Sequence, residues 1–451
     1  MVIYVSPTDA NGEAPVYAPL MKELLTTRRN IFLTGRAGTG KTTLLKKVLQ
    51  RAGDKAVVLA PTGLAAVNAG GQTIHSFFKF PPRLLDRADI KKMRAQRLVK
   101  TIETMVIDEI SMVRSDMLQA IDEMLKMNRN SREPFGGVRM ILSGDLHQLP
   151  PVVESQVEPI LQDAYGGPWF FRAPAFHGAQ FRLAALKHVF RQADPQFVAI
   201  LNGLRNSRLA PDQVETLKKR VTGRSPAEAS ETHIVLTPNN AAAWRINQQR
   251  LEELPGVPSI FEGVADGQFD ERSFPTEAEL ELKVGARVML IKNDPQGRWV
   301  NGSIGTVEAL SDKDAFVSID GETHRIAPQA WEKYRYEFDS DKKAVNRQVV
   351  GSFRQLPLRL AYAVTIHKSQ GMTLDNVYID FDNGMFAHGQ AYVAFSRCRS
   401  LDGLELSREL RPRDIIIDKT AFAFGKLSIL QETEDFLLAD MKGEEFRLEG
   451  G

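Results

Sequence analysis

The stretch Gly35-Arg36-Ala37-Gly38-Thr39-Gly40-Lys41-Thr42 decides the fold. It fits the pattern G-x-x-x-x-G-K-[ST] at every fixed position, and it lies between an apolar, β-rich run at 30–34 and a helical pattern at 42–51. Glycines let the backbone wrap a phosphate chain with its N–H groups pointing inward, and the N-terminus of the following helix favours negative charge. We therefore expect a P-loop that binds a nucleoside triphosphate.

The expected nucleotide contacts come from this loop and the residue after it: Gly35, Arg36, Ala37, Gly38, Thr39, Gly40, Lys41, Thr42 and Thr43. Lys41 is expected to reach the β- and γ-phosphates, and the Thr42 hydroxyl to bind Mg²⁺. A simple glycine-rich turn would account for the glycines alone. It would not account for strand, spacing and helix together.

Similar apolar runs recur along the chain and indicate an α/β fold with a parallel sheet. Runs at 30–34, 57–60, 105–107 and 140–143 read as buried strands, with helical patterns at 42–51 and 111–125 between them. Polar residues gather just after each run, at the strand ends where ligands bind in such sheets. A second α/β set begins near 234–236 and resumes at 377–380.

Residues 282–350 have a different character. The segments 284–291, 304–307 and 315–319, with an Asn301-Gly302 turn, read as short antiparallel strands. We expect them to form a small β-barrel insert within the second domain.

The bulk composition is compatible with the predicted fold and nucleotide site but gives no further support for either. The chain has 451 residues, 43% of them hydrophobic and 25% charged, which suits a globular protein of two or more domains. A single cysteine, Cys398, excludes an internal disulfide framework, and no apolar run is long enough to span a membrane, so the expected compartment is cytoplasmic. The net charge of +2 permits a nucleic-acid partner through a local patch such as the basic stretch 83–100, which could also be a solvated helix face.

The pair Asp108-Glu109 ends the run at 105–107. A carboxylate at a strand end can hold Mg²⁺, directly or through water, which is the role expected of Asp108. Glu109 is placed to polarise the attacking water as general base. Together with the P-loop, the pair favours hydrolysis over phosphoryl transfer to a small molecule.

The run at 140–143 is followed by Gly144-Asp145-Leu146-His147-Gln148. Gln148 could sense the γ-phosphate and orient water, because an amide both donates and accepts hydrogen bonds. The alternative is a capped turn in which Asp145 bonds the backbone.

Two arginines, Arg191 in HVFRQ and Arg397 in YVAFSR, are candidate arginine fingers. A permanently charged fork can stabilise charge on a transferring phosphoryl group. If the fingers and the P-loop lie on different domains, ATP binding would draw those domains together and hydrolysis would release them.

The ordered set of motifs resembles the PIF helicases and, more distantly, the RecD-like enzymes, both of the 5′-to-3′ branch of helicase superfamily 1. The blocks that carry the resemblance are GRAGTGKT, APTGLAAVNAGGQTIHSFF (60–78), VIDEISM (106–112), LSGDLHQLPPV, HVFRQAD, TIHKSQGMTLD (365–375) and YVAFSRCRS (392–400). They span roughly residues 20 to 405. TIHKSQG and FSR are the most specific, since generic P-loop proteins lack them.

The resemblance implies two RecA-like motor domains, a small wedge insertion in the first and a src-homology-type barrel in the second. The expected bounds are 1–185 for the first domain with its insertion at about 77–100, 186–281 and 351–425 for the second domain, 282–350 for the barrel, and 426–451 for an acidic C-terminal segment.

The resemblance also implies site residues. The catalytic set would be Lys41, Asp108, Glu109, Gln148, Arg191 and Arg397, with Thr42 and Asp108 as metal ligands and Gln148 and Gly371 added to the nucleotide contacts. The nucleic-acid contacts would be Thr62, His75, Ser76, Phe77, Thr365, His367, Lys368 and Ser369. Taken singly, His75 and His367 would more often be structural histidines.

Two further features bear on this reading. Family members carry an adenine-reading glutamine shortly before the P-loop, and residues 21–25 contain none. The cluster Trp169-Phe170-Phe171 could be mistaken for a base-stacking platform, but we expect it in the core.

The motifs together predict an ATP- and Mg²⁺-dependent DNA helicase. The resemblance further implies movement 5′-to-3′ on single-stranded DNA and a role in replication, repair, recombination or telomere maintenance. Expected partners are single-stranded DNA and tailed or forked duplexes, with quadruplexes and RNA–DNA hybrids as further candidates, and the chain is expected to be a monomer. A translocase without strand separation, an RNA motor and an ATP-gated binding module are the alternatives.

Overall fold

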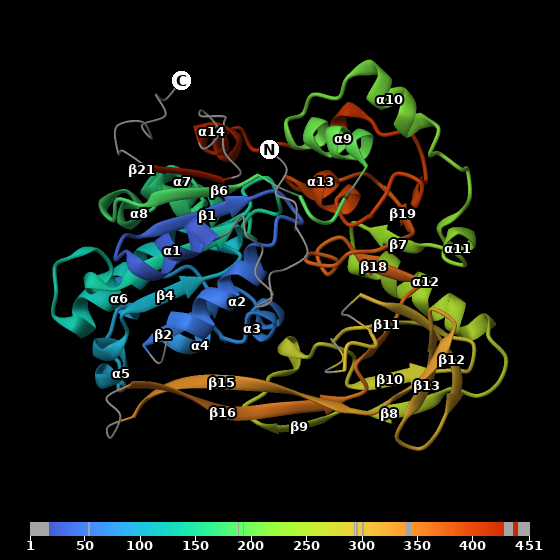
Figure 1. Ribbon diagram of the computed structural model, residues 1–451, viewed down its shortest axis with the longest axis horizontal. Coiled ribbons are helices and arrows are strands. Elements are labelled where there is room, and N and C mark those ends of the chain that lie inside the picture. Colours follow the sequence, from blue (N-terminus) through green and yellow to red (C-terminus); the bar gives the residue numbers. More distant parts are fainter. Residues whose placement is uncertain are drawn as a thin grey trace. The chain divides into compact units, whose positions relative to one another are not determined.

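The computed structural model describes residues 18–52, 55–187, 189–192, 194–292, 294, 296–299, 302–339, 344–427 and 436–440. The chain forms two compact units, whose elements are labelled in Figure 1. Unit 1 comprises 1–190, 333–350 and 418–451, and unit 2 comprises 191–332 and 351–417.

Unit 1 is built on a seven-stranded sheet in the order β21-β6-β1-β5-β4-β2-β3. All neighbouring strands pair in parallel except β21, which runs antiparallel to β6. The strands are β1 (Ile31–Gly35), β2 (Ala56–Ala60), β3 (Gln72–Thr73), β4 (Thr104–Ile107), β5 (Arg139–Gly144), β6 (Arg182–Leu186) and β21 (Phe436–Asp440). The four strands predicted in this unit are confirmed.

Helices cover both faces of this sheet. They are α1 (Ala18–Thr26), α2 (Lys41–Ala52), α3 (Gly63–Ala69), α4 (Ile74–Phe78), α5 (Gln96–Thr101), α6 (Ser115–Arg129), α7 (Glu158–Tyr165), α8 (Pro174–Gly178) and α14 (Lys419–Leu427), with short 3-10 turns at Arg87–Asp89, Ile110–Met112, Pro134–Gly137 and Phe170–Arg172. Alternate residues of each strand enter different cores, so Met105 and Ile107 pack with α6 whereas Val106 packs with α1 and α2.

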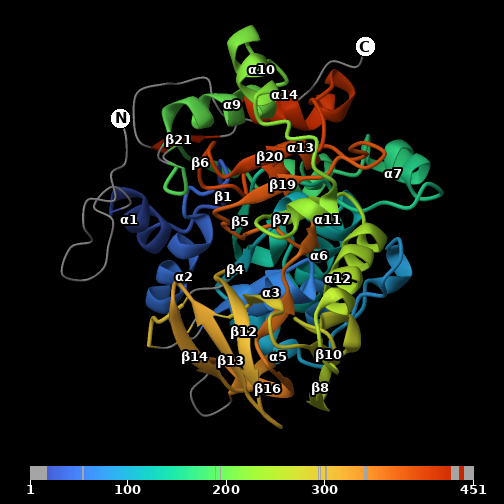
Figure 2. The same ribbon diagram turned by 90° about the vertical axis from the view of Figure 1, so that its right-hand side faces the viewer.

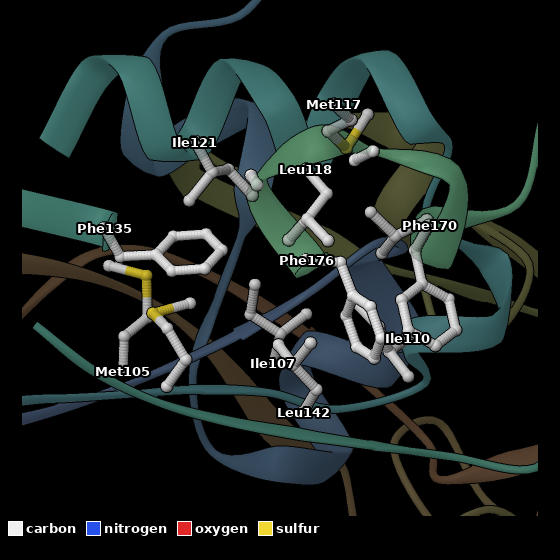
Figure 3. Packing of buried hydrophobic residues seen from close by; sticks show 14 of the residues in the cluster. Met105, Ile107, Ile110, Met117, Leu118, Ile121, Phe135, Leu142, Phe170 and Phe176 are labelled. Atoms are coloured by element: carbon white, nitrogen blue, oxygen red, sulfur yellow. The ribbon is translucent and has the colours of Figure 1, made fainter. Parts of the chain in front are cut away.

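The core under α6 explains the apolar pattern of that helix (Figure 3). Met117, Leu118 and Ile121 point from α6 toward the strand residues Ile107 and Leu142. The aromatic residues of 169–171 lie in the same core with at most 2% of their surface exposed, which confirms that Trp169-Phe170-Phe171 is packing rather than a stacking platform.

The helix predicted at 111–125 is displaced. Residues Ile110–Met112 form a 3-10 turn, and α6 runs from Ser115 to Arg129. The chain is extended at Val113 and Arg114, and Arg114 then pairs with Asp116 in the first turn of the helix (2.8 Å). The apolar periodicity continues through this break and hid it.

Unit 2 contains a second parallel sheet in the order β18-β7-β19-β20. Its strands are β7 (Ile234–Thr237), β18 (Ala363–Thr365), β19 (Val377–Ile379) and β20 (Leu404–Leu406). The helical elements of unit 2 are α9 (Pro195–Arg205), α10 (Pro211–Lys218), α11 (Pro226–Ala229), α12 (Asn240–Glu253) and α13 (Gln390–Phe395), with 3-10 turns at Glu271–Ser273 and Pro412–Asp414.

Antiparallel strands occupy the region between β7 and β18, as predicted. The largest group is a five-stranded sheet in the order β14-β13-β12-β11-β17, and β12, β13 and β14 lie side by side in Figure 2. Its strands are β11 (Arg287–Leu290), β12 (Ile304–Leu310), β13 (Ala315–Ile319), β14 (Glu322–Ile326) and β17 (Leu358–Leu360). Smaller sheets contain β8 (Ser259–Glu262) with β10 (Glu279–Leu282), and β9 (Val264–Gly267) with β15 (Gln329–Asp339) and β16 (Ala344–Gln355).

The strand predicted at 284–291 is shorter than expected. Val284 is exposed and Gly285 has a positive φ of 87°, so the ladder begins only at Arg287. Of the predicted Asn301-Gly302 turn, Asn301 lies outside the described residues, and Gly302 has a φ of 98°. Among the described residues, no helix is long and apolar enough to cross a membrane.

Candidate active site

The P-loop lies at the carboxyl end of β1, where the sequence predicted it. Gly38 and Gly40 have positive φ values of 77° and 79°, a region that side chains disfavour. At Gly35 a Cβ atom would lie 2.7 Å from the carbonyl oxygen of Leu186 on the neighbouring strand β6. The three glycines are therefore required by the path of the loop.

Lys41 opens α2 with its side chain directed back over the loop. Its Nζ donates to the carbonyl oxygens of Gly35 (2.8 Å) and Arg36 (3.1 Å), and the Thr39 hydroxyl donates to the latter (2.9 Å). The first turn of α2 contains no acidic residue. The ammonium group, the loop N–H groups and the helix N-terminus thus form an anion site. Thr42 and Thr43 follow in this turn with exposed side chains.

Asp108 lies opposite Thr42, one strand beyond β5 in the sheet order. Its carboxylate accepts a hydrogen bond from the Thr42 hydroxyl (3.4 Å) and one from the N–H of Glu109 (3.0 Å). Burial raises the pKa of Asp108, and the nearby Lys41 opposes that rise. A hydroxyl and a carboxylate at this separation are the hard oxygen ligands that suit Mg²⁺, so the residues present fit that ion.

Glu109 has a left-handed backbone, with φ 51° and ψ 44°. This conformation costs a residue other than glycine about 1–2 kcal/mol. Strain of this kind persists where the surrounding structure enforces it, often at functional sites. Gly144 permits the close approach of the turn that follows Glu109, because a Cβ atom at position 144 would lie 2.9 Å from the side chain of Ile110.

The turn after β5 is a capped turn, which was one of the two alternatives for it, and the role of Gln148 at the γ-phosphate stays a prediction. Asp145 caps the turn by accepting from the N–H of His147 (3.1 Å). Its other carboxylate oxygen accepts from Nε2 of Gln148 (3.3 Å), whose side chain is buried. Asp145 therefore holds the turn and also fixes the amide of Gln148.

The nucleic-acid candidates of unit 1 lie after β2 and β3. Thr62 caps α3 by accepting from the N–H of Ala65 (3.2 Å), and the hydroxyl of Ser76 accepts from Gln72 (2.8 Å). His75 is half-buried, and burial lowers its pKa. Phe77 is 4% exposed and packs in the core, so its ring offers little surface to a nucleic acid.

A cavity of about 520 Å³ lies beside α4 within the predicted wedge insertion. Its walls carry apolar side chains together with basic ones, the latter being Lys79, Arg83, Lys91, Lys92, Arg94 and Arg335. Burial, followed by repulsion from Arg335 and Lys333, lowers the pKa of Lys79. Sequence reasoning identified the basic stretch but not the contribution of Arg335, which comes from β15.

The candidates of the TIHKSQG block form a turn after β18. The hydroxyls are used inside this turn, since Thr365 accepts from the N–H of Lys368 (3.3 Å) and Ser369 donates to the carbonyl of Ile366 (2.8 Å). Thr365 and Ser369 are buried, whereas His367 is half-buried and Lys368 is exposed. Burial lowers the pKa of His367.

Arg397 joins this turn to α13 and is 1% exposed. Its guanidinium donates to the carbonyl oxygens of Val393 (2.9 Å), Ser369 (3.4 Å) and Met372 (3.4 Å) and to the hydroxyl of Ser396 (2.7 Å). The Arg397 guanidinium therefore links the TIHKSQG turn to helix α13.

Arg191 lies at the same junction. It donates to the carbonyls of Ser396 (3.1 Å) and Gly371 (3.3 Å), and burial lowers its pKa to about 10, so the side chain stays charged at neutral pH. Sequence reasoning missed its neighbour Gln192, which is buried and donates to the carbonyls of Ser396 (3.0 Å) and Cys398 (2.8 Å). The adjacency of Arg191 and Gln192 in HVFRQ was the available signal.

Comparisons with known proteins identify the family. The family described as PIF1-like helicase matches residues 15–165. The chain is 33% identical over 417 residues to the ATP-dependent DNA helicase Pif1 of Bdellovibrio bacteriovorus, covering 90% of each chain, and 33% identical over 392 residues to human PIF1, covering 84% of this chain and 58% of that protein.

Solved structures agree. The Pif1 of Bacteroides sp in complex with ADP-AlF4 is similar to this chain with a TM-score of 0.86 at 35% identity, over 94% of this chain and 98% of that one. Bacteroides Pif1 bound to ssDNA gives a TM-score of 0.65 at 36% identity, over 91% and 96%. With the P-loop, the Asp108-Glu109 pair and the TIHKSQG turn in place, we conclude that this chain belongs to the Pif1-like helicase family.

Proposed function

We propose that this ATP-dependent DNA helicase hydrolyses ATP at the carboxyl edge of the unit 1 sheet and moves 5′-to-3′ along single-stranded DNA. The observation that carries the catalytic part is the convergence of Lys41, Thr42 and Asp108 beside Glu109, whose backbone is held in a strained conformation. The proposed polarity rests on the resemblance to the 5′-to-3′ branch of helicase superfamily 1.

Each group has a distinct task in this proposal. Lys41 and the loop N–H groups bind the phosphate chain, and Thr42 with Asp108 holds Mg²⁺, which supplies charge neutralisation when bound. Glu109 takes the proton of the attacking water, and Gln148, fixed by Asp145, orients that water. Arg191 and Arg397 are proposed to respond to the nucleotide through the turn that they both hold.

For the DNA we propose two kinds of contact. Thr62, Ser76, His367 and Lys368 touch the sugar–phosphate backbone without reading bases, as a motor on any sequence requires. Thr365 and Ser369 shape the turn that presents His367 and Lys368. The basic cavity beside α4 lies in the wedge insertion, where a separating junction would meet positive charge.

The remaining assignments rest on the family. We propose two RecA-like domains at 1–185 and at 186–281 with 351–425, a src-homology-type barrel at 282–350, tailed or forked duplexes as substrates, and a monomeric motor. The core of buried residues shared by β11, β12, β13 and β14 supports a β insert at these bounds, and β8, β10 and β17, from the flanking chain, contribute to the same core.

Strand displacement on matched 5′- and 3′-tailed duplexes tests the proposal. We expect ATP-dependent displacement from the 5′-tailed substrate, no displacement by Lys41→Ala, and wild-type behaviour of Lys46→Ala, whose side chain is exposed on the same helix. Preferential displacement from the 3′-tailed duplex would refute the proposed polarity.

A further inference from the structure

Phe386 is an exposed aromatic residue in the loop between β19 and α13. Its side chain is 64% exposed, whereas Phe381 and Met385 in the same loop are buried. Single exposed apolar residues are common on protein surfaces and need no explanation by themselves. Two further observations distinguish Phe386 from such a residue.

The first observation is that the backbone carrying Phe386 is held in place. The side chain of Gln390, which is fully buried, accepts hydrogen bonds through Oε1 from the N–H groups of Phe386 (2.9 Å) and Ala387 (3.3 Å). The N–H of Gly389 bonds to the carbonyl of Ile416 (3.1 Å). An exposed ring on a fixed backbone loses less conformational entropy when it binds a partner than a ring on a free loop does.

The second observation is the neighbour of this ring. The imidazole of His367 lies nearly parallel to the ring of Phe386, with a ring-centroid distance of 6.4 Å and an interplanar angle of 19°. Lys368, next in the chain, is exposed. Paired aromatic faces beside a cation are the groups by which proteins hold single strands, because every base has a face that can stack and every nucleotide carries a phosphate.

Trp244 on α12 provides a contrast. It is 66% exposed, and among the residues that the structure describes it has no aromatic ring partner. Exposure alone therefore does not produce the arrangement found at Phe386, and Trp244 is a matched control for it.

We propose that Phe386 and His367 form a stacking platform for one nucleobase of the single-stranded DNA, with Lys368 on the adjacent phosphate. The inference rests on the proposed function and adds a base contact to a set of residues otherwise assigned to the backbone. Because stacking tolerates any base, the platform would set the register of the strand without sequence preference.

The test uses oligothymidine strands with a single 2-aminopurine placed at successive positions, bound to the full chain without nucleotide. Stacking on an aromatic ring quenches this fluorophore, so the wild type is expected to show one strongly quenched position. Phe386→Leu should lose that quenching and bind the strand about 5- to 100-fold more weakly. Phe386→Trp should retain both, and Trp244→Leu should match the wild type.

The possible outcomes distinguish the stacking platform from the proposed helicase function. Unchanged quenching in Phe386→Leu, quenching at no position in the wild type, or weaker binding with unchanged quenching would each overturn the platform. Thermal unfolding of Phe386→Leu at the wild-type temperature would show that the fold is intact, as expected for an exposed side chain. Failure of the wild type to displace strands would instead refute the proposed function, and the quenching measurement does not depend on it.

Discussion

The carboxyl edges of the two parallel sheets carry motif residues that differ in their exposure to solvent. At the unit 1 edge, Thr42 is exposed and its hydroxyl faces Asp108, and Lys41 is partly exposed while its Nζ donates to two carbonyls of the loop. At the unit 2 edge, Ser369 and Arg397 are buried and bonded to the backbone of their own unit. A shared position in the fold therefore does not imply a shared task.

The difference has a physical basis. A group that binds a charged ligand must keep donors or charge available, whereas a buried group must satisfy its own polar atoms within the protein. Arg397 donates four hydrogen bonds inside unit 2. Changes at the exposed residues of the first edge should therefore remove chemistry and spare the fold, and a change at a buried residue of the second edge, such as Arg397, should affect both.

The largest effect is expected from Lys41→Ala. Removing the ammonium group that faces the phosphates should lower DNA-stimulated ATP hydrolysis by more than about 10³-fold. DNA affinity and the unfolding temperature should stay near those of the wild type. Steady-state hydrolysis, DNA binding and calorimetry check this, with Lys46→Ala as control. Substantial residual turnover would refute the role of Lys41.

The next effect is expected at Glu109. Glu109→Gln should reduce turnover by about 10²- to 10⁴-fold with nucleotide affinity retained, because the amide cannot accept the proton. Single-turnover hydrolysis and equilibrium nucleotide binding measure the two quantities. Turnover near that of the wild type would remove Glu109 as the base.

The backbone of Glu109 gives a separate prediction. Glu109→Gly and Glu109→Ala both remove the carboxylate, but only glycine adopts φ 51° without strain. The glycine variant should therefore be more stable than the alanine variant by about 1 kcal/mol in the free energy of unfolding. Urea denaturation of the two inactive variants measures this difference, and equal stabilities would show that the strain is negligible.

Arg397→Ala should affect both stability and turnover. Its loss removes the donor to the carbonyl groups of Ser369 and Met372, at a cost of about 3 kcal/mol in the free energy of unfolding. Arg399→Ala is the control two residues away. It breaks an exposed ion pair with Asp375 (2.9 Å) that contributes less than about 1 kcal/mol. Equal denaturation midpoints for the two variants would contradict the structural role of Arg397.

The smallest effect is expected from Lys368→Ala, the exposed cation of the second edge. Removing one phosphate contact should reduce the slope of log affinity for single-stranded DNA against log salt concentration by about 0.7. Fluorescence titration at several salt concentrations measures the slope. An unchanged slope would mean that Lys368 does not touch a phosphate.

The sequence predicted the geometry of the unit 1 edge better than that of the unit 2 edge. The P-loop and the strand before Asp108 could be predicted because local spacing dictates their geometry. The inward direction of Arg397 could not, because its acceptors lie on residues 369, 372 and 393, which only the tertiary fold brings together. The strand β21 was missed for a related reason, since a five-residue run in an acidic segment gives little signal until β6 is present to pair with it.

Hydrogen–deuterium exchange of the turn at 366–372 tests the contrast between the two edges most directly. The N–H groups of Ser369, Gln370 and Met372 are bonded within this turn, and Arg397 contacts two of its carbonyls. We predict that these amides exchange faster in Arg397→Ala and at the wild-type rate in Lys41→Ala. Wild-type exchange in Arg397→Ala would contradict the account.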